Sequence, residues 1–326
     1  MARISVFLNS QASQGNSCFS REDILKFFID HELAIHSPKN LDDLNKKLNE
    51  EISSGVDYIF SVGGDGTVNT ISQHLVGKKI KLMVLPAGTA NDFATENGIT
   101  KCVKRASEIF HLNLTKKIDA ININGTYMMS NGGLGIACEV AKSVNSLRKS
   151  SPFFKKLMKL LGKETYSLIY AYKMLVKPFS SRRLFIESPD SPLLDPRISS
   201  PLILINNQEY IGGKFRVAPA TRNDDGKFNV TLFLHKNKID LMKCTLQMLQ
   251  GVYPKNDPEL ISFETDRLTI NAIDNNPLEF FGDGETFSPS KTLDINIRIK
   301  ALEVCGDKTE VLYCPDLTKN EVELKQ

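Results

Sequence analysis

The sequence contains no uncharged apolar run of about 18 residues, the length that a membrane-spanning helix requires. The opening residues, MARISVFLNSQ, also hold too short an apolar stretch for a secretory signal. We therefore expect a cytoplasmic protein. The composition, with 41% apolar and 24% charged residues, is that of a globular chain and excludes disordered and collagen-like proteins.

Spacings typical of zinc sites and redox motifs are missing as well. The six cysteines are spread along the chain without a CxxC pair, and the five histidines form neither HxxxH nor HExxH. We expect reduced, mostly buried thiols and assign the histidines no role. The excess of positive charge is also small, at +3, so we expect no nucleic-acid partner.

The chain has 326 residues, which is enough for about two domains. Its first third alternates strand and helix signals, because apolar runs at 3–8, 58–62 and 81–85 are separated by segments with helical spacing. Such alternation with short connections predicts parallel strands in an open sheet. We predict an α/β domain with a Rossmann-like open parallel sheet over residues 1–120, which residues 304–326 could complete.

Beyond residue 120, β-like segments follow one another closely. They are IDAINI, TYMMS, RLFIES, PLILINN, KFNVTLF, RLTINA and LDINIRI, and turns rich in Asn, Gly, Asp and Pro separate them. One helical segment, at about 140–176, interrupts the series. Closely spaced strands without helices between them predict an antiparallel, sandwich-like domain, and we assign this β-rich domain to residues 121–303.

A glycine cluster follows the strand predicted at 58–62 and opens a helix. It reads Gly63-Gly64-Asp65-Gly66-Thr67-Val68-Asn69. Glycines let the backbone approach a ligand closely, and the N–H groups and dipole at a helix start favour phosphate oxygens. Asp65 would repel a bare phosphate, so its presence predicts a bridging Mg²⁺. The alternative is a tight turn in which Asp65 caps the helix.

A second loop of the same kind follows the strand predicted at 81–85. It reads Pro86-Ala87-Gly88-Thr89-Ala90-Asn91-Asp92-Phe93-Ala94. Neighbouring parallel strands end on the same edge of a sheet. We therefore expect the two loops to lie side by side, with Asp65 and Asp92 facing one cleft. The alternative is a plain loop with an Asx-type cap.

These two loops resemble the catalytic domain of the diacylglycerol kinase and sphingosine kinase family, and most closely that of the bacterial soluble lipid kinases. GGDGT alone also occurs in NAD kinases and phosphofructokinases, but here further motifs follow in the family's order. They are Asn9 to Gly15, Asn131 to Ala137 with Val140, Gly162 to Tyr166, Asn206-Asn207, Gly212-Gly213, Pro219-Ala220, Asp225-Gly226 and Phe281 to Glu285. The chain departs from the pattern at Ser10, Gln14 and Lys214, where the family has Pro, Lys and commonly Gly; the missing Lys removes a phosphate-facing charge.

The resemblance implies that ATP binds in a cleft between the two domains and that its γ-phosphoryl group is transferred to a lipid hydroxyl. The residues that it assigns to the nucleotide are Asn9, Ser13, Ser37, Gly63, Gly64, Asp65, Gly66, Thr67, Val68, Asn69, Gly88, Thr89, Asn91 and Asp92. It assigns Mg²⁺ to Asp65 and Asp92, held directly or through water. It also makes residues 121–303 the lipid-substrate domain.

The catalytic residues implied by the resemblance are Asp65 and the late Asp283-Gly284-Glu285 motif. A lipid hydroxyl needs a base to accept its proton, and we predict Glu285 for this role. Repulsion from Asp283, two residues away, would raise one carboxyl pKa and suit a base. The alternative is a hairpin turn, for which Asp-Gly is a favoured pair.

A second metal site is implied at the turn around Asp225-Gly226, where related bacterial kinases hold a structural Mg²⁺. The ligands would be the Asp225 carboxylate and the backbone carbonyls of Arg222 and Lys227. A set with one carboxylate and several carbonyls suits a hard cation that keeps its waters. The alternative is a plain β-turn.

Residues Phe153 to Lys163 form a basic amphipathic pattern on a helical wheel. The apolar residues fall in one arc, and Lys155, Lys156, Lys159 and Lys163 fall on the opposite side. Such a helix is typical of a transient contact with an anionic membrane surface, where a lipid substrate lies. The alternative is that its apolar face packs on the β-rich domain. The oligomeric state stays open, a homodimer included.

We therefore predict an ATP- and Mg²⁺-dependent lipid kinase that converts diacylglycerol to phosphatidic acid. Three alternatives stay open. The first is a kinase for another lipid alcohol, such as a sphingoid base or phosphatidylglycerol, and the second is a relative of the NAD kinases. The third is a nucleotide- or lipid-binding protein that has lost catalysis, which the residues Ser10 and Gln14 motivate.

Overall fold

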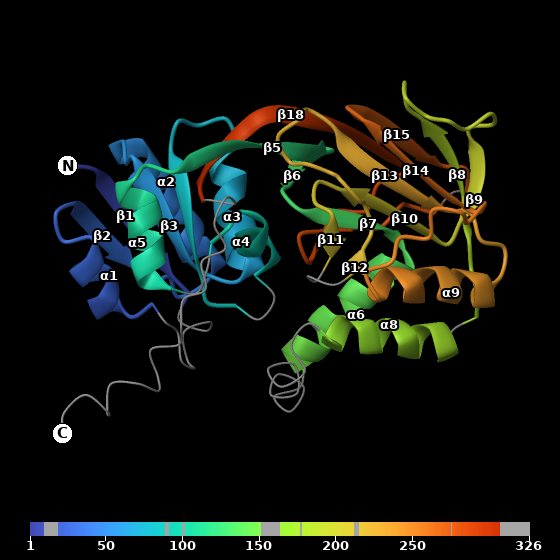
Figure 1. Ribbon diagram of the computed structural model, residues 1–326, viewed down its shortest axis with the longest axis horizontal. Helices are drawn as coiled ribbons and strands as arrows, with labels where there is room; N and C mark the ends of the chain where they lie inside the picture. The colour runs from blue at the N-terminus through green and yellow to red at the C-terminus, as the bar shows by residue number, and fades with distance from the viewer. Residues whose placement is uncertain are drawn as a thin grey trace.

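The computed structural model describes residues 1–9, 19–88, 91–99, 102–150, 164–176, 178–211, 215–274 and 276–306. Two lobes lie side by side, and two long strands run between them (Figure 1). None of the helices in these ranges is long and apolar enough to cross a membrane.

The N-terminal lobe is a parallel sheet with helices on both faces. Its strands are β1 (Arg3–Leu8), β2 (Glu32–His36), β3 (Tyr58–Gly63) and β4 (Lys81–Pro86), in the order β2-β1-β3-β4. Its helices are α1 (Arg21–Phe27), α2 (Leu41–Ser54), α3 (Asp65–Leu75), α4 (Asp92–Glu96) and α5 (Val103–His111). This arrangement confirms the predicted open α/β sheet.

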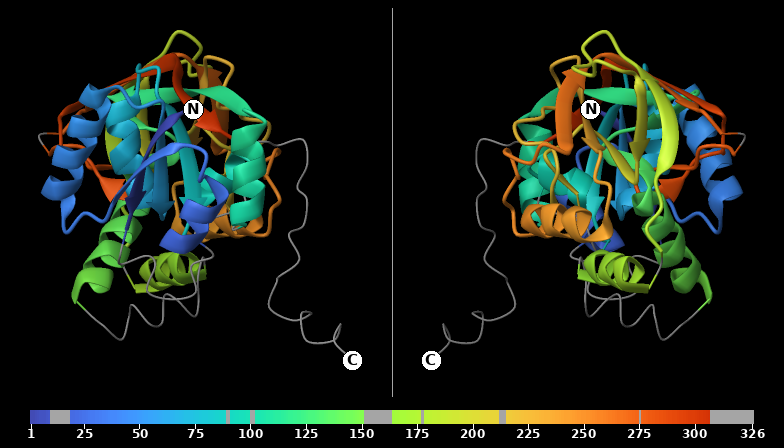
Figure 2. Two further views of the ribbon diagram at one scale, coloured as in Figure 1. Left: turned by 90° about the vertical axis from the view of Figure 1, so that its left-hand side faces the viewer. Right: turned by 90° about the vertical axis from the view of Figure 1, so that its right-hand side faces the viewer.

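The two faces of this sheet carry separate hydrophobic clusters, because side chains alternate along a strand. Ile59 of β3 packs with Leu48 of α2 and Ile71 of α3. Its neighbour Phe60 points to the other face and packs with helices α1 and α5 through residues such as Phe110. Figure 2 shows helices on both sides of the sheet. Strands buried on both faces explain the nearly continuous apolar runs in the sequence.

The C-terminal lobe is built mainly from antiparallel strands. They are β5 (Thr115–Ile123), β6 (Thr126–Met128), β7 (Asn131–Gly135), β8 (Arg182–Glu187), β9 (Arg197–Ser200), β10 (Leu202–Asn206), β11 (Tyr210–Ile211), β12 (Phe215–Arg216), β13 (Phe228–Phe233), β14 (Leu260–Thr265), β15 (Arg267–Ala272), β16 (Phe280–Gly282), β17 (Glu285–Thr286) and β18 (Thr292–Cys305). A six-stranded sheet, β14-β13-β10-β7-β16-β17, faces the strands β18-β15-β8-β9 of a ten-stranded sheet. Buried residues from both sheets form one core between them, which confirms the predicted sandwich-like domain.

One strand joins the two lobes into a continuous sheet. The first half of β18 pairs antiparallel with β15, whereas Glu303 and Val304 near its end pair parallel with β4. β18 also pairs with β5 along its length, with a bulge between Arg298 and Leu302. The predicted domain boundary near residue 120 lies within β5, and the residues beyond 306 lie outside the described part of the chain.

The helices of the C-terminal lobe differ from the prediction. Within the helical segment expected at 140–176 the structure describes α6 (Ile136–Ser150) and α8 (Glu164–Val176), and residues 151–163 lie outside the described residues. An unexpected helix, α9 (Lys238–Leu249), lies between β13 and β14. Asn237 caps it by accepting a hydrogen bond from the backbone N–H of Asp240, at 3.0 Å. Together α6, α8 and α9 lie on the lower side of this lobe in Figure 1.

Candidate active site

The two glycine-containing loops meet at the carboxyl edge of the parallel sheet. β3 ends at Gly63 and β4 at Pro86, and the N–H of Ala87 donates to the carbonyl of Gly63 at 2.9 Å. The backbones then touch, since a Cβ added to Gly88 would lie 2.5 Å from the Cα of Gly64. No side chain fits between them, so glycine is required here for close approach rather than for flexibility.

Asp65 is the first residue of α3, and its carboxylate bridges the two loops. One oxygen, Oδ1, accepts a hydrogen bond from the backbone N–H of Phe93 at the start of α4, at 3.2 Å. The pKa of Asp65 is raised to about 6, mainly by burial and also by the charge of Asp92. The charge of Asp283, on the other lobe, contributes to the same rise. Three carboxylates from two lobes therefore lie near the start of α3.

Glu285 comes to the same place from the β16–β17 hairpin. Its Oε1 lies 3.8 Å from the position that a Cβ on Gly66 would occupy, in the first turn of α3. The side chain is exposed. The turn before it contains Asp283 and Gly284, both with positive φ (52° and 82°), so the hairpin turn that we considered as an alternative is also present.

Asp283 is a structural anchor for this hairpin. Its carboxylate accepts hydrogen bonds from the backbone N–H groups of Met129 and Ser130, both at 2.8 Å, and from the Ser130 hydroxyl. Burial raises the pKa of Asp283, and these hydrogen bonds oppose the rise; Glu285 is not among the causes. The expected mutual repulsion of Asp283 and Glu285 therefore has no role in this geometry, because Asp283 is turned to residues 129–130.

Further contacts fix the backbone around the glycine loop. Asn9, after β1, donates through Nδ2 to Thr67 Oγ1 at 2.9 Å. Asn69 accepts through Oδ1 from Gln73 Nε2 at 2.8 Å, and Gln73 forms two hydrogen bonds with the backbone of Tyr127 on β6. Asn9 is thus brought into contact with Thr67 of α3, whereas Asn69, on the same helix, contacts Gln73.

Three other residues predicted to bind the nucleotide lie within their own loop, in the core or on the surface. Asn91 closes its own loop, since its side chain exchanges hydrogen bonds with the N–H and carbonyl of Gly88 at 2.9 and 2.7 Å. Val68 is buried in the core, and Ser37 is exposed after the edge strand β2. Ser13 and Thr89 lie outside the described residues, as do Ser10, Gln14, Lys214 and the segment Phe153 to Lys163.

Comparison with known proteins identifies both halves of the chain. Residues 3–123 match the family described as diacylglycerol kinase catalytic domain. Residues 166–306 match the family described as YegS C-terminal NAD kinase beta sandwich-like domain. This chain belongs to the diacylglycerol kinase-like lipid kinases.

Individual proteins resemble this lipid kinase over most of its length. "Diacylglycerol kinase" of Bacillus subtilis strain 168 is 26% identical and is matched over 81% of this chain and 84% of its own length. "Probable lipid kinase YegS-like" of Klebsiella pneumoniae strain 342 is 27% identical and is matched over 78% of this chain and 80% of its own length. A crystal structure from Bacillus anthracis strain Sterne, of a provisionally assigned diacylglycerol kinase, has a TM-score of 0.74 with 19% identity, and covers 95% of this chain and 99% of that chain. The last comparison shows a shared fold.

Asp119 of the lipid kinase is a site-organising residue that we did not predict. Its fully buried carboxylate accepts hydrogen bonds from the N–H of Gly226 at 2.7 Å and from the N–H of Lys300 in the β18 bulge at 2.6 Å. Its own N–H donates to the carbonyl of Asn223 at 2.7 Å. Asp119 therefore fastens the 223–226 turn to the strand that joins the lobes.

The turn predicted to hold a structural Mg²⁺ has an exposed carboxylate. Asp225 Oδ1 accepts a hydrogen bond from the N–H of Lys227 at 3.1 Å, whereas the Arg222 side chain pairs with Asp224 at 2.9 Å. This is the geometry of a β-turn closed by its own aspartate. Cation binding by Asp225 and by the carbonyls of Arg222 and Lys227 stays a prediction.

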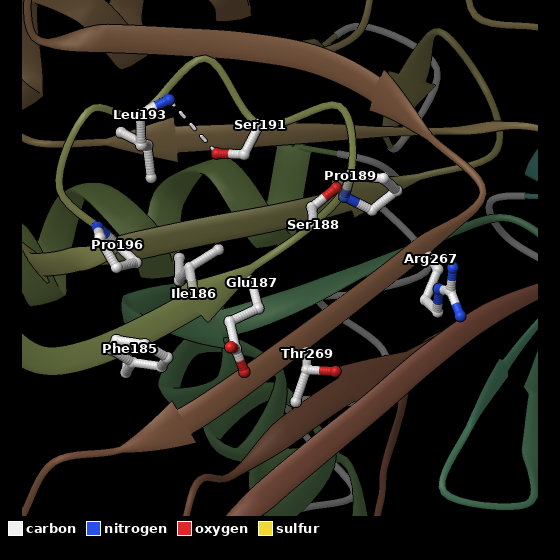
Figure 3. Close-up of a pocket in the computed structure, with 10 residues that line it drawn as sticks. All are labelled: Phe185, Ile186, Glu187, Ser188, Pro189, Ser191, Leu193, Pro196, Arg267 and Thr269. Carbon is white, nitrogen blue, oxygen red and sulfur yellow. Dashed lines mark hydrogen bonds between the residues drawn. The ribbon is translucent and has the colours of Figure 1, made fainter.

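A pocket of about 480 Å³ lies elsewhere in the lipid kinase, between β8, β15 and the proline-containing loop 188–196 (Figure 3). Within that loop the Ser191 hydroxyl accepts a hydrogen bond from the N–H of Leu193 at 3.3 Å. β8 lies towards the end of the ten-stranded sheet opposite to the end formed by β1 to β4. None of the predicted site residues within the described ranges lines the pocket, so it is separate from the carboxylate cluster.

Proposed function

We propose that this kinase transfers the γ-phosphoryl group of ATP to the hydroxyl of diacylglycerol and so forms phosphatidic acid. One observation supports this proposal above the others: the Glu285 carboxylate, carried by the second lobe, lies beside Gly66 in the glycine loop of the first lobe. A phosphate chain held at that loop would end next to a carboxylate that can accept a proton. Acids and glycines at one helix start are the arrangement that phosphoryl transfer needs.

The glycine loop supports binding of the nucleotide phosphates. Gly64 is the N-cap of α3, and the helix begins at Asp65 without a capping side chain. The N-terminus of a helix carries a partial positive charge and N–H groups that favour anions. Gly66 is exposed at this point, so its backbone is accessible to a ligand. We infer that the triphosphate lies across the start of α3, with Asn9 and Thr67 holding the adjacent backbone.

The carboxylates suit a divalent cation. Asp65 and Asp92 repel each other, which contributes to the raised pKa of Asp65, and a hard cation with oxygen ligands would relieve this repulsion. We propose that these two residues hold Mg²⁺, directly or through water. When bound, Mg²⁺ would neutralise negative charge on the phosphate oxygens.

The lipid hydroxyl would lose its proton to Glu285 as the new O–P bond forms and the bond from the γ-phosphorus to the leaving ADP breaks. Glu285 is exposed, so its carboxylate is accessible to a bulky substrate. Asp283 would act as a positioning residue, because its three hydrogen bonds with residues 129–130 hold the hairpin that carries Glu285. General-base catalysis of this type contributes about 10²- to 10⁴-fold in rate.

The test is a substrate panel with labelled ATP, excess Mg²⁺ and mixed micelles. Diacylglycerol, a sphingoid base and phosphatidylglycerol are offered separately, and NAD is offered in solution because the second family is described as NAD kinase-like. We expect label in phosphatidic acid. Label in NAD, or tight nucleotide binding without any turnover, would contradict the proposal, and label in another lipid would correct the substrate.

The base is tested in the same assay with Glu285→Gln. We expect diacylglycerol phosphorylation to fall by at least about 10²-fold. Glu264→Gln is the matched control, since Glu264 lies on β14, at the end of the six-stranded sheet opposite to β17. A Glu285→Gln enzyme with the rate of wild type would remove Glu285 from the mechanism.

Membrane contact through Phe153 to Lys163 stays a hypothesis. Its test is flotation with anionic vesicles, comparing wild type with a variant in which Lys155, Lys156, Lys159 and Lys163 are replaced by Gln. We expect reduced flotation, because each lysine near an anionic surface contributes about 1 kcal/mol. Unchanged flotation would favour the packing alternative.

A further inference from the structure

Three potential metal ligands come together in the C-terminal lobe, away from the carboxylate cluster. They are His235, just after β13, Cys244 on α9, and Asp257, just before β14. Each offers one ligand atom, and these atoms all lie within 4.8 Å of one another. Donors bound to one tetrahedral metal at 2.0–2.3 Å lie somewhat under 4 Å apart, so small side-chain movements would complete the site.

The cluster is buried on one side and open on the other. His235 and Cys244 have exposed fractions of 1% and 2%, whereas the side chain of Asp257 is 22% exposed. His235 Nε2 lies 3.0 Å from Asp257 Oδ2, and Asp257 Oδ1 accepts a hydrogen bond from the N–H of Glu259 at 2.9 Å. A metal could therefore reach the cluster past Asp257 and keep a water ligand on that side.

His235 also has an unexplained polar atom. Its Nδ1 is buried and has no hydrogen-bond partner among the described residues. Buried polar atoms are nearly always hydrogen-bonded, and an unpartnered one points to a missing ligand or to a different ring orientation. Its other nitrogen, Nε2, faces Asp257, and the imidazole is presented to the cluster from the core.

The alternative interpretation of the cluster is that Cys244 is a reactive cysteine. The chemistry of this thiol does not fit that interpretation. The pKa of Cys244 is raised to about 12, mainly by burial and also by the charge of Asp257 and a hydrogen bond with it. A thiol of this kind is protonated and is not a nucleophile at neutral pH. The thiol packs with Leu241 and Met248 of the same helix, against the six-stranded sheet.

We propose that His235, Cys244 and Asp257 bind one Zn²⁺ ion, with a water molecule as the fourth ligand. Nitrogen, sulfur and carboxylate oxygen are the donors that zinc takes in proteins, and a thiolate donor excludes Mg²⁺ as the preferred ion. Binding replaces the thiol proton of Cys244, which is released to solvent, by a Zn–S bond. No group is oxidised or reduced.

The consequence of the site is mechanical rather than catalytic. The three ligands belong to the end of β13, to α9 and to the loop before β14, which are consecutive elements of one connection. Zinc would clamp α9 onto the outer face of the six-stranded sheet, which it covers together with α8. In Figure 1 α9 lies in the C-terminal lobe, whereas α3 and α4 lie in the N-terminal lobe. The ion would therefore stabilise the lipid kinase without entering phosphoryl transfer.

The test uses the full chain without an affinity tag, stripped with a chelator and then kept in excess Mg²⁺ so that hard-cation sites are filled. Co²⁺ is titrated as a spectroscopic substitute for Zn²⁺. We expect one equivalent to bind, with near-ultraviolet absorption from thiolate-to-Co²⁺ charge transfer that Zn²⁺ abolishes. Zinc at about 100 times its Kd should raise the melting temperature by about 5 °C.

Two variants and a control identify the ligands. Cys244→Ala and His235→Gln should each lose the absorption band and the stabilisation by zinc. Cys138→Ala should keep both, since Cys138 is an equally buried helical cysteine (2% exposed) outside the cluster. Absence of one-to-one Co²⁺ binding by the wild-type protein, or a thiolate band that persists in Cys244→Ala, would overturn the proposal.

Discussion

Asp65 links the electrostatics of the site to the stability of the folded chain. Its pKa is about 6 in the folded protein, against an ordinary 3.8. The folded state therefore binds more protons than the unfolded state between these two pH values. In protein freed of divalent cations, the contribution of Asp65 to the free energy of unfolding should fall as the pH rises from about 4 to about 6, and its cost should be complete at pH values above its folded pKa.

This behaviour leads to a prediction for Asp65→Asn. The amide keeps an oxygen that can accept the hydrogen bond from Phe93 but has no charge to bury. In EDTA the variant should be more stable than wild type by about 2 kcal/mol at about pH 8 and equal to it near pH 4. Urea unfolding across this range measures the difference. A difference that does not depend on pH would contradict the assigned cause.

Asp283 has a structural role, which Asp283→Asn tests. The introduced amide NH₂ would face the N–H groups of Met129 and Ser130, so one or more donors lose their acceptor. We expect a loss of about 1–3 kcal/mol in the free energy of unfolding together with a lower kcat. Glu285→Gln should lower kcat with an unchanged melting temperature, because its side chain is exposed. Equal melting temperatures for both variants would refute this division of roles.

At the scale of elements, the contact between the two loops decides which glycines tolerate a side chain. Gly88→Ala should lower the free energy of unfolding by about 1–3 kcal/mol, because its Cβ would meet Gly64 at 2.5 Å. Gly66→Ala should leave the melting temperature unchanged or higher, since among the described residues its Cβ meets only Glu285, at 3.8 Å, within the distance of ordinary contact. Thermal unfolding of the two variants measures this. The opposite order would show that the loops do not touch.

The elements that could be predicted from the sequence are those whose signal is local. Strands β3 and β4 are short apolar runs that end at Gly63 and at Pro86, and parallel pairing then brings their ends together. Helix α9 was missed although Asn237 and Asp240 form a capping pair before it. Its neighbours along the chain, β13 and β14, are strands, and the expectation of a continuous β domain outweighed the cap.

Residues with distant partners could not be found in the same way. In the sequence Asp119 is one polar residue in a strand of alternating character. Its hydrogen-bond partners Gly226 and Lys300 are 107 and 181 positions away along the chain. His235, Cys244 and Asp257 could not be predicted as a metal site either, because their spacing matches no short ligand motif. Their proximity follows from the packing of α9 on the sheet, which only the fold supplies.

At the scale of the whole molecule, β5 and β18 make the two lobes parts of one sheet. Asp119 lies where these strands and the 223–226 turn meet. Asp119→Ala would leave two buried N–H groups without acceptors, so we expect a loss of about 2–4 kcal/mol in the free energy of unfolding and reduced activity. Asp294→Asn, an exposed change on β18, is the control and should be neutral. A neutral Asp119→Ala would exclude the anchoring role.

The account depends on carboxylates of both lobes acting at one reaction centre. The most direct measurement is the single-turnover rate of diacylglycerol phosphorylation for wild type, Asp65→Asn, Glu285→Gln and the double variant. Residues that act as a unit are strongly non-additive. We predict that each single change lowers the rate by at least about 10²-fold, and that the double variant is little slower than the slower single variant. A wild-type rate for either single variant, or losses that multiply in the double variant, would contradict the account.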